Sequence, residues 1–241
     1  MKNFSKLLLM SLMFISCTAN TTVDLRDNMS GTVSVVFNVK PEFERIRREL
    51  VATLGGEKVA RMPLFPVDEI RKYFKDLGED SGLKLSEIKE KGDSLELVVE
   101  FDNLGKVLKD YLEKETMPLL KVENKNGRNI IDIDINIKNV TKIINDNKES
   151  INDALAALLP SEEVPMTEKE YRDVLVYFLS DFTSKAGELI DSSNIKLKIK
   201  TSRKIKEQFG FKQTSLNNLE FKLDMIKGLS LEKPIRLRLV Y

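Results

Sequence analysis

The stretch NIKLKIK, residues 194–200, decides the fold class of this chain. Apolar and lysine side chains alternate along it, and this period of two is typical of a β-strand with one buried and one solvated face. The strands of a parallel α/β sheet are buried on both faces and read as continuous apolar runs instead. The stretch therefore predicts a mainly antiparallel sheet with one wet face.

The same alternation recurs on both sides of this stretch. It appears in TVSVVFNV (32–39), LELVVEF (95–101), NIIDIDINI (129–137), LEFKLDM (219–225) and IRLRLVY (235–241). Gly92-Asp93 and Asn126-Gly127 lie at positions where hairpin turns are expected. The chain thus contains enough one-faced strands for a sheet of several antiparallel members.

Amphipathic helices account for most of the remaining sequence. Apolar residues at helical spacing predict helices after Pro41, after Pro66, over 104–112, from Val140 to Leu159 and from Tyr171 to Ile190. Thr167 and Glu170 have the spacing of a capping box for the last of these. Because the apolar side of the sheet must be buried, we expect an α+β fold in which a mainly antiparallel, curved β-sheet has one face covered by these helices.

The N-terminal residues have the layout of an export signal. In MKNFSKLLLMSLMFISCTAN (1–20), two lysines precede an apolar run that is about half the ~20 residues a spanning helix needs. The run ends at Cys17, the chain's one cysteine, and Phe14-Ile15-Ser16-Cys17 resembles the lipobox of bacterial lipoproteins. We therefore predict a signal peptide at 1–16 that is removed and a thiol at Cys17 that carries diacylglycerol, with a further acyl chain such as palmitate. Residues 17–31 are expected to form a lipidated tether, and 32–241 a single α+β domain with a helical segment near 140–190.

Composition excludes several classes of function. The chain has no histidine, which removes Ser-His and Cys-His nucleophile pairs and the usual zinc sites. A net charge of +1 gives no long-range field to attract nucleic acid. We therefore expect no enzymatic activity, no cofactor, no metal and no nucleic-acid partner. A hydrolase that uses two carboxylates is the enzymatic alternative.

Two groups of charged residues are candidate sites. Asp132 and Asp134 project on the same side of a strand and suggest a cation site or a carboxylate pair, but the glycine-bearing ligand loop of a calcium site is missing. Three alternating lysines and two alternating arginines would form a basic strip if their strands paired: Lys196, Lys198, Lys200, Arg236 and Arg238. A solvated strand face of mixed charge explains both groups more simply.

Several short motifs resemble the LppM-like family of bacterial lipoproteins. These are Cys17, the segments DLRDNMSGTVSVVF (24–37) and KGDSLELVVEFDNL (91–104), and a lysine-rich strand followed by two closing strands near the C-terminus. The resemblance covers about half of the chain after residue 16. It implies an exported, membrane-anchored α+β domain that looks like a binder of lipids or other hydrophobic ligands, and it supplies no binding residues.

Two non-enzymatic functions fit these observations. The first is a lipoprotein, exported and lipid-anchored on the periplasmic or surface side of a bacterial membrane, that binds a lipid or other hydrophobic ligand in the cell envelope. Its expected lining is the inward faces of the last three strands together with the helix from Tyr171 to Ile190. The alternative is a structural or assembly lipoprotein that contacts partner proteins in the envelope and binds no small molecule. The sequence does not indicate which membrane leaflet holds the anchor or whether the protein forms oligomers.

Overall fold

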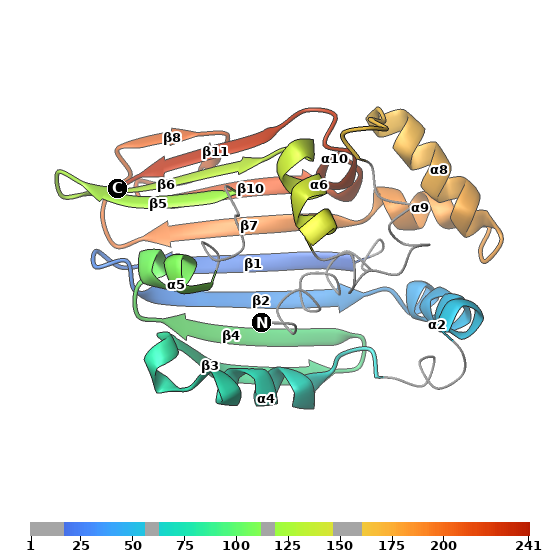
Figure 1. The fold of residues 1–241 in the computed structure, drawn as a ribbon, viewed down its shortest axis with the longest axis horizontal. Coiled ribbons are helices and arrows are strands. Elements are labelled where there is room, and N and C mark those ends of the chain that lie inside the picture. Colours follow the sequence, from blue (N-terminus) through green and yellow to red (C-terminus); the bar gives the residue numbers. More distant parts are fainter. Residues whose placement is uncertain (1–16, 56–62, 112–118, 147–160) are drawn as a thin grey trace.

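The computed structural model describes residues 17–55, 63–111, 119–146 and 161–241, and it confirms the expected α+β class (Figure 1). The strands form two sheets, one of seven strands and one of four. The single curved sheet expected from the alternation is thus divided in two. The signal peptide expected at residues 1–16 lies outside the described residues.

The larger sheet is antiparallel except at its centre. Its strands run, in order across the sheet, β3 (Leu83–Lys91), β4 (Ser94–Phe101), β2 (Gly31–Val39), β1 (Cys17–Leu25), β7 (Asn194–Thr201), β10 (Asn218–Asp224) and β9 (Lys212–Gln213). β1 pairs antiparallel with β2 and parallel with β7. β1 and the lysine-rich strand β7 are therefore neighbours, although residues 26–193 separate them in sequence.

Strand β1 corrects the expectation of a tether at residues 17–31. Cys17 pairs with Val39, and Thr18 pairs with Asn194, so the ladder begins at the first residue of the supposed tether. Threonine, asparagine and alanine in this segment weaken the apolar–polar alternation that marks the other strands, so its sequence resembles a linker. In the sheet, its backbone hydrogen bonds are satisfied on both sides.

The smaller sheet contains four antiparallel strands. They are β5 (Leu120–Lys125), β6 (Arg128–Ile135), β11 (Ile235–Val240) and β8 (Glu207–Phe209). β11, the last of the three closing strands, thus pairs with β6 and β8 and does not adjoin β7 or β10. Alternation predicted β6 and β11, and the expected turn at Asn126-Gly127 implied β5, but β8 was not predicted and the pattern carried no information about which strands are neighbours.

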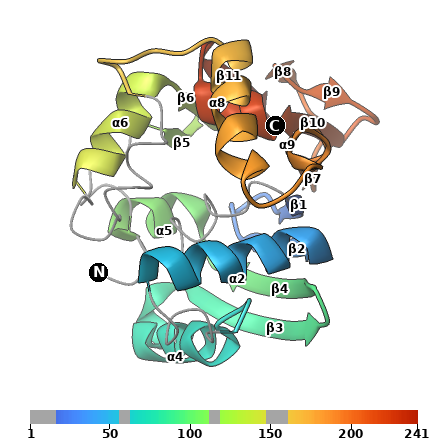
Figure 2. The same cartoon turned by 90° about the vertical axis from the view of Figure 1, so that its right-hand side faces the viewer.

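The helices lie on one side of the strands and at one end of the larger sheet. They are α2 (Pro41–Gly55), α4 (Val67–Leu77), the short 3₁₀ turn η1 (Glu79–Ser81), α5 (Leu104–Tyr111), α6 (Ile137–Asp146), α8 (Glu168–Ser180), α9 (Ala186–Asp191) and α10 (Met225–Ser230). In Figure 2, α4, α5 and α6 lie to one side of the strands, while α2, α8 and α9 face the viewer at the end of the sheet.

The long helix expected from Tyr171 to Ile190 is two helices. The predicted capping box is confirmed: Thr167 Oγ1 accepts from the Glu170 amide, and the Glu170 carboxylate accepts from the Thr167 amide at 2.8 Å. α8 ends at Ser180, and α9 starts at Ala186 after a short turn. Part of the other expected helix, residues 147–159, lies outside the described residues.

Buried apolar side chains form three clusters in the described part of the chain. The helical cluster joins α2, α8, α9 and α10 and contains Ile46, Tyr171, Leu175, Leu179, Ala186, Leu189, Ile190, Met225, Ile226 and Leu229. The inter-sheet cluster joins the two sheets and contains Leu25, Met29, Phe101, Ile131, Ile199, Ile205, Leu219, Leu239 and Tyr241. The α4 cluster contains Val39, Phe43, Phe65, Ile70 and Leu95.

Close contacts between the strands restrict one position in particular. A Cβ on Gly31 would lie 1.9 Å from the Asp24 carbonyl oxygen and 2.8 Å from the Phe101 ring. Only glycine allows this approach where β1 turns into β2, next to the inter-sheet cluster.

Candidate functional site: an apolar sheet face and the end that holds Cys17

The strand register places a row of apolar side chains across the middle of the larger sheet. We call this the central row; it consists of Ile88, Leu97, Val35, Thr21, Leu197 and Phe221, which are partners in successive strand pairs. Each of these side chains is only half-buried. Fully buried residues lie instead in the rows toward the strand ends, where the three clusters are.

Two of the three clusters contact the central row. Leu97 and Ile88 contact the α4 cluster, and Leu197 contacts the inter-sheet cluster. Phe221 meets the ring of Phe211 edge-on, with ring centroids 6.3 Å apart. An apolar sheet face whose centre is less buried than its ends is a surface on which an apolar ligand could gain burial.

The elements expected to line a ligand site do not all meet at the central row: two of the three strands contribute to it, but β11 lies in the smaller sheet and the helix is part of the core. β7 and β10 supply Leu197 and Phe221 to the central row. Tyr171, Leu175 and Leu179 are instead at most 1% exposed and pack inside the helical cluster. Burial raises the pKa of the Tyr171 hydroxyl well above its ordinary value. The inward face of α8 is therefore core.

The opposite face of the larger sheet has mixed charge. Lys200 lies 3.7 Å from Asp24, and Lys198 lies 3.5 Å from Glu220. The expected strip of lysines and arginines is not formed, because the arginines belong to the smaller sheet. The lysines thus form part of an ordinary solvated sheet face.

Asp132 and Asp134 face arginines on the neighbouring strand. Arg238 forms a two-pronged contact with Asp132 at 2.7 and 2.9 Å, and Arg236 lies 3.7 Å from Asp134. In the part of the chain that the structure describes, no three acidic or cysteine side chains gather as metal ligands. The two carboxylates therefore act as partners in cross-strand ion pairs.

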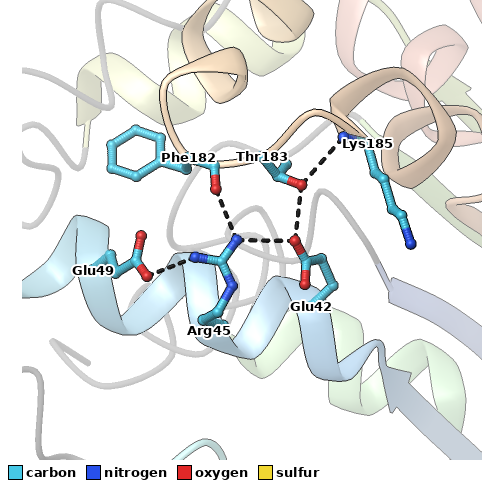
Figure 3. A network of polar contacts seen from close by, with 6 residues as sticks. All are labelled: Glu42, Arg45, Glu49, Phe182, Thr183 and Lys185. Carbon is cyan, nitrogen blue, oxygen red and sulfur yellow. Dashed lines mark hydrogen bonds and ion pairs between the residues drawn. The ribbon is translucent and has the colours of Figure 1, made fainter.

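A polar network that sequence reasoning missed joins α2 to the turn between α8 and α9 (Figure 3). Arg45 donates to the Phe182 carbonyl at 2.7 Å and to Glu42 at 2.9 Å. Thr183, which is 8% exposed, donates to the same Glu42 oxygen at 2.8 Å and accepts from the Lys185 amide. The hydrogen bonds from Arg45 and Thr183 lower the pKa of Glu42. The Glu-x-x-Arg spacing of α2 signals the first pair, but nothing in the sequence indicates Thr183.

A second ion-pair group lies on the same helix. Glu44, 8% exposed, accepts from Arg47 at 2.6 and 3.0 Å and from Arg48 at 2.7 Å. Burial raises the pKa of Glu44, but the hydrogen bonds from the two arginines outweigh it, so the pKa lies below its ordinary value. This carboxylate is held ionised and stabilises α2.

Cys17 lies at the end of the larger sheet where α2 begins and α9 stops. Its partner Val39 is two residues before α2, and Asn194, the partner of Thr18, follows α9 after two residues. Lys40 donates to the Ser192 hydroxyl and so links these two flanks. Within the described residues, no helix is both long and apolar enough to span a membrane.

Comparisons with known proteins give one structural match. No protein-family model and no curated protein matches the chain. The fold is similar to the NMR structure of the folded domain of the Mycobacterium tuberculosis protein LppM, with a TM-score of 0.40 and 6% sequence identity over 93% of this chain and 88% of that one. The structural match is weak, but it agrees with the resemblance to the LppM-like family that the sequence indicates. At this identity and TM-score, no residue role or ligand is carried over.

Proposed function

We propose that this protein is a bacterial lipoprotein, anchored by acyl chains on Cys17, that binds a lipid or similar amphiphile against the central row. In this proposal residues 1–16 are removed on export, and the domain works on the outer side of the membrane without catalysing a reaction. The main support is the half-buried central row, which two of the three clusters contact.

The dimensions and chemistry of the central row suit an acyl chain. The row crosses six strands that are about 4.8 Å apart, so it extends for about 24 Å. Five of its six side chains are apolar, and the sixth, Thr21, presents a methyl group as well as a hydroxyl. Each methylene that leaves water on such a surface contributes about 0.8 kcal/mol.

Two adjacent valines on β2 provide a matched test of ligand binding. Val35 belongs to the central row, whereas Val36 points to the opposite face beside Asn20 and Glu96. Val35→Asn should weaken binding of a pyrene-labelled fatty acid about tenfold, since it removes roughly 1.4 kcal/mol of apolar contact, about half of a fully buried valine. Val36→Asn should leave binding unchanged. A wild-type lipoprotein that takes up no probe, or equal losses in both variants, would remove the support for this site.

The anchor is tested separately by metabolic labelling. Cells that express the full chain should incorporate an alkyne-tagged palmitate into the wild-type protein and not into Cys17→Ser, because the chain has no other thiol. Absence of label from the wild type would refute lipidation. Such a result would not bear on the proposed ligand site, which the two valine variants test independently.

An assembly role is the second candidate, favoured by two exposed apolar side chains. Phe209 and Leu216 are 61% and 63% exposed, close to the β8 and β9 edges of the two sheets. Large exposed apolar residues can mark a protein interface. A photo-crosslinking residue at position 209 should capture a discrete envelope protein in cells if this role is correct, and yield only monomer if it is not.

The proposal includes no catalytic role. The candidate acidic residues, Asp132 and Asp134, form ion pairs with Arg238 and Arg236. Purified lipoprotein that turned over a glycoside or ester substrate, with loss of activity in Asp132→Asn, would contradict this part of the proposal.

A further inference from the structure

We infer that the end of the domain formed by α2, α8 and α9 rests on the membrane, with Tyr177 in the headgroup layer. This inference depends on the proposed lipidation of Cys17. The partner of this surface is the same lipid bilayer that holds the anchor. The surface and the anchor together therefore determine the orientation of the domain on the membrane.

The first step is the absence of a tether after Cys17. The β-ladder begins at Cys17 opposite Val39, and Thr18 is already held between β2 and β7. Acyl chains on Cys17 would therefore join the body at the end of the sheet with no flexible residues between. The part of the domain around this strand end must lie within a few ångströms of the headgroups.

The second step places α8 at that end. Asn194 pairs with Thr18 and lies three residues after Asp191, the last residue of α9. Arg172 on α8 binds the Asp191 carboxylate with two hydrogen bonds of 2.8 and 2.7 Å. The network of Figure 3 ties the turn after α8 to α2. The helices at this end therefore form one cross-linked group with the start of β1.

The third step is the outward surface of α8. Its inner side chains are buried in the helical cluster, whereas Val174 is 38% and Tyr177 is 82% exposed. Figure 2 views this end directly and shows α2, α8 and α9 foremost. Tyrosine is enriched at membrane interfaces, because its ring enters the boundary of the acyl region while its hydroxyl stays hydrated.

A rival surface exists at the other end of the sheet. Phe209 and Leu216 are exposed there among cationic side chains that include Lys204, Lys206 and Lys212, a composition that also suits an anionic membrane. β1 rises by about 3.3 Å per residue, so its Leu25 end lies about 26 Å from Cys17. The β8 and β9 segments adjoin the Leu25 end, through Ser202, whose amide donates to Leu25. An anchor at Cys17 therefore favours the α8 end over this one.

The chain contains no tryptophan, so single tryptophans report on position without background. Tyr177→Trp and Phe209→Trp are matched variants, since both replace an exposed aromatic residue at opposite ends of the domain. Each full-length, lipidated protein is reconstituted into phosphatidylcholine–phosphatidylglycerol vesicles, with and without lipids brominated on the upper acyl carbons. Tyr177→Trp should be strongly quenched by the brominated lipid, and Phe209→Trp should keep its fluorescence.

The outcomes separate the orientation from the anchor. Quenching of Phe209→Trp alone, of both variants equally, or of neither in vesicle-bound protein would overturn the inferred orientation and leave the lipoprotein proposal intact. Protein that fails to float with the vesicles and carries no acyl label would refute the anchor, and the inference would fall with it. Far-ultraviolet circular dichroism controls for the fold of both variants.

Discussion

Replacing Glu44 by glutamine should destabilise the domain in a pH-dependent manner. The substitution keeps the shape and one acceptor oxygen of the side chain but removes its charge. In the wild-type chain, the Glu44 side chain is only 10% exposed and forms ion pairs with two arginines. The side chain of Arg47 is 15% exposed and that of Arg48 is 67% exposed. Water screens the Arg48 contact, so most of the effect comes from Arg47.

The expected loss at neutral pH is about 2 kcal/mol, the size of one charge-assisted hydrogen bond formed out of water. For a domain of this size, such a loss lowers the melting temperature by about 6 °C. The pKa of Glu44 is lower in the folded chain than its ordinary value of 4.5. Its contribution is therefore complete above pH 4.5 and disappears as the pH falls through the lower folded pKa.

The assay is denaturant unfolding of wild type and Glu44→Gln at a series of pH values from 7 to 3. The gap between the two unfolding free energies should be constant down to about pH 4.5 and then close. Glu49→Gln, on the same helix with a side chain 47% exposed, is the control and should lose less than about 0.5 kcal/mol. Equal losses in the two variants, or a gap that does not narrow at all as the pH falls below 4.5, would refute the assigned role of Glu44.

Three further predictions follow from burial and backbone geometry. Leu175→Ala should lower the unfolding free energy by about 3 kcal/mol, since the side chain is fully buried; a loss below about 1 kcal/mol in denaturant unfolding would contradict a solid helical cluster. Gly31→Ala should greatly reduce the melting temperature, whereas Gly92→Ala, at positive φ but in open space, should cost only about 1 kcal/mol. Burial raises the pKa of Tyr241 to about 12 and that of Tyr171 above its ordinary range, so ultraviolet titration of the folded chain should show both phenols still protonated at about pH 10, where the phenol of a model peptide is half ionised. Their contribution to stability is complete below about pH 10 and, for Tyr241, is lost as the pH rises through 12. Ionisation of Tyr171 or Tyr241 at about pH 10 in the folded chain would contradict this last prediction.

Strands with alternating charge were predictable because their periodicity records burial directly. In β7 and β10, lysines and glutamates mark the wet face, and the apolar residues between them lie on the central-row side. β1 was not predictable in this way. Its inward side chains include Ala19 and Thr21, whose apolar surface is too small to stand out from the polar positions between them.

Other features depend on information that periodicity does not carry. The apolar spacing of α8 continues through Phe182 into α9, because both helices pack into the same cluster, so the break between them is invisible in the pattern. Alternation indicates which side of a strand is buried and not which strand lies beside it, and so the two sheets could not be separated. The central row follows from the register of β1 with β2 and β7 and became visible only in the structure.

The parallel pairing of β1 with β7 determines the order in which the chain can fold. β1 to β4 can pair as a local antiparallel sheet as soon as residue 101 is available, but one edge of β1 stays open until β7 has emerged near the end of synthesis or export. An unpaired strand edge can pair with strands of other molecules, and apolar edge strands do this most readily. β1 is rich in threonine and asparagine, which also hides its strand pattern in the sequence. This polar composition lowers the risk that β1 aggregates while its edge is unpaired.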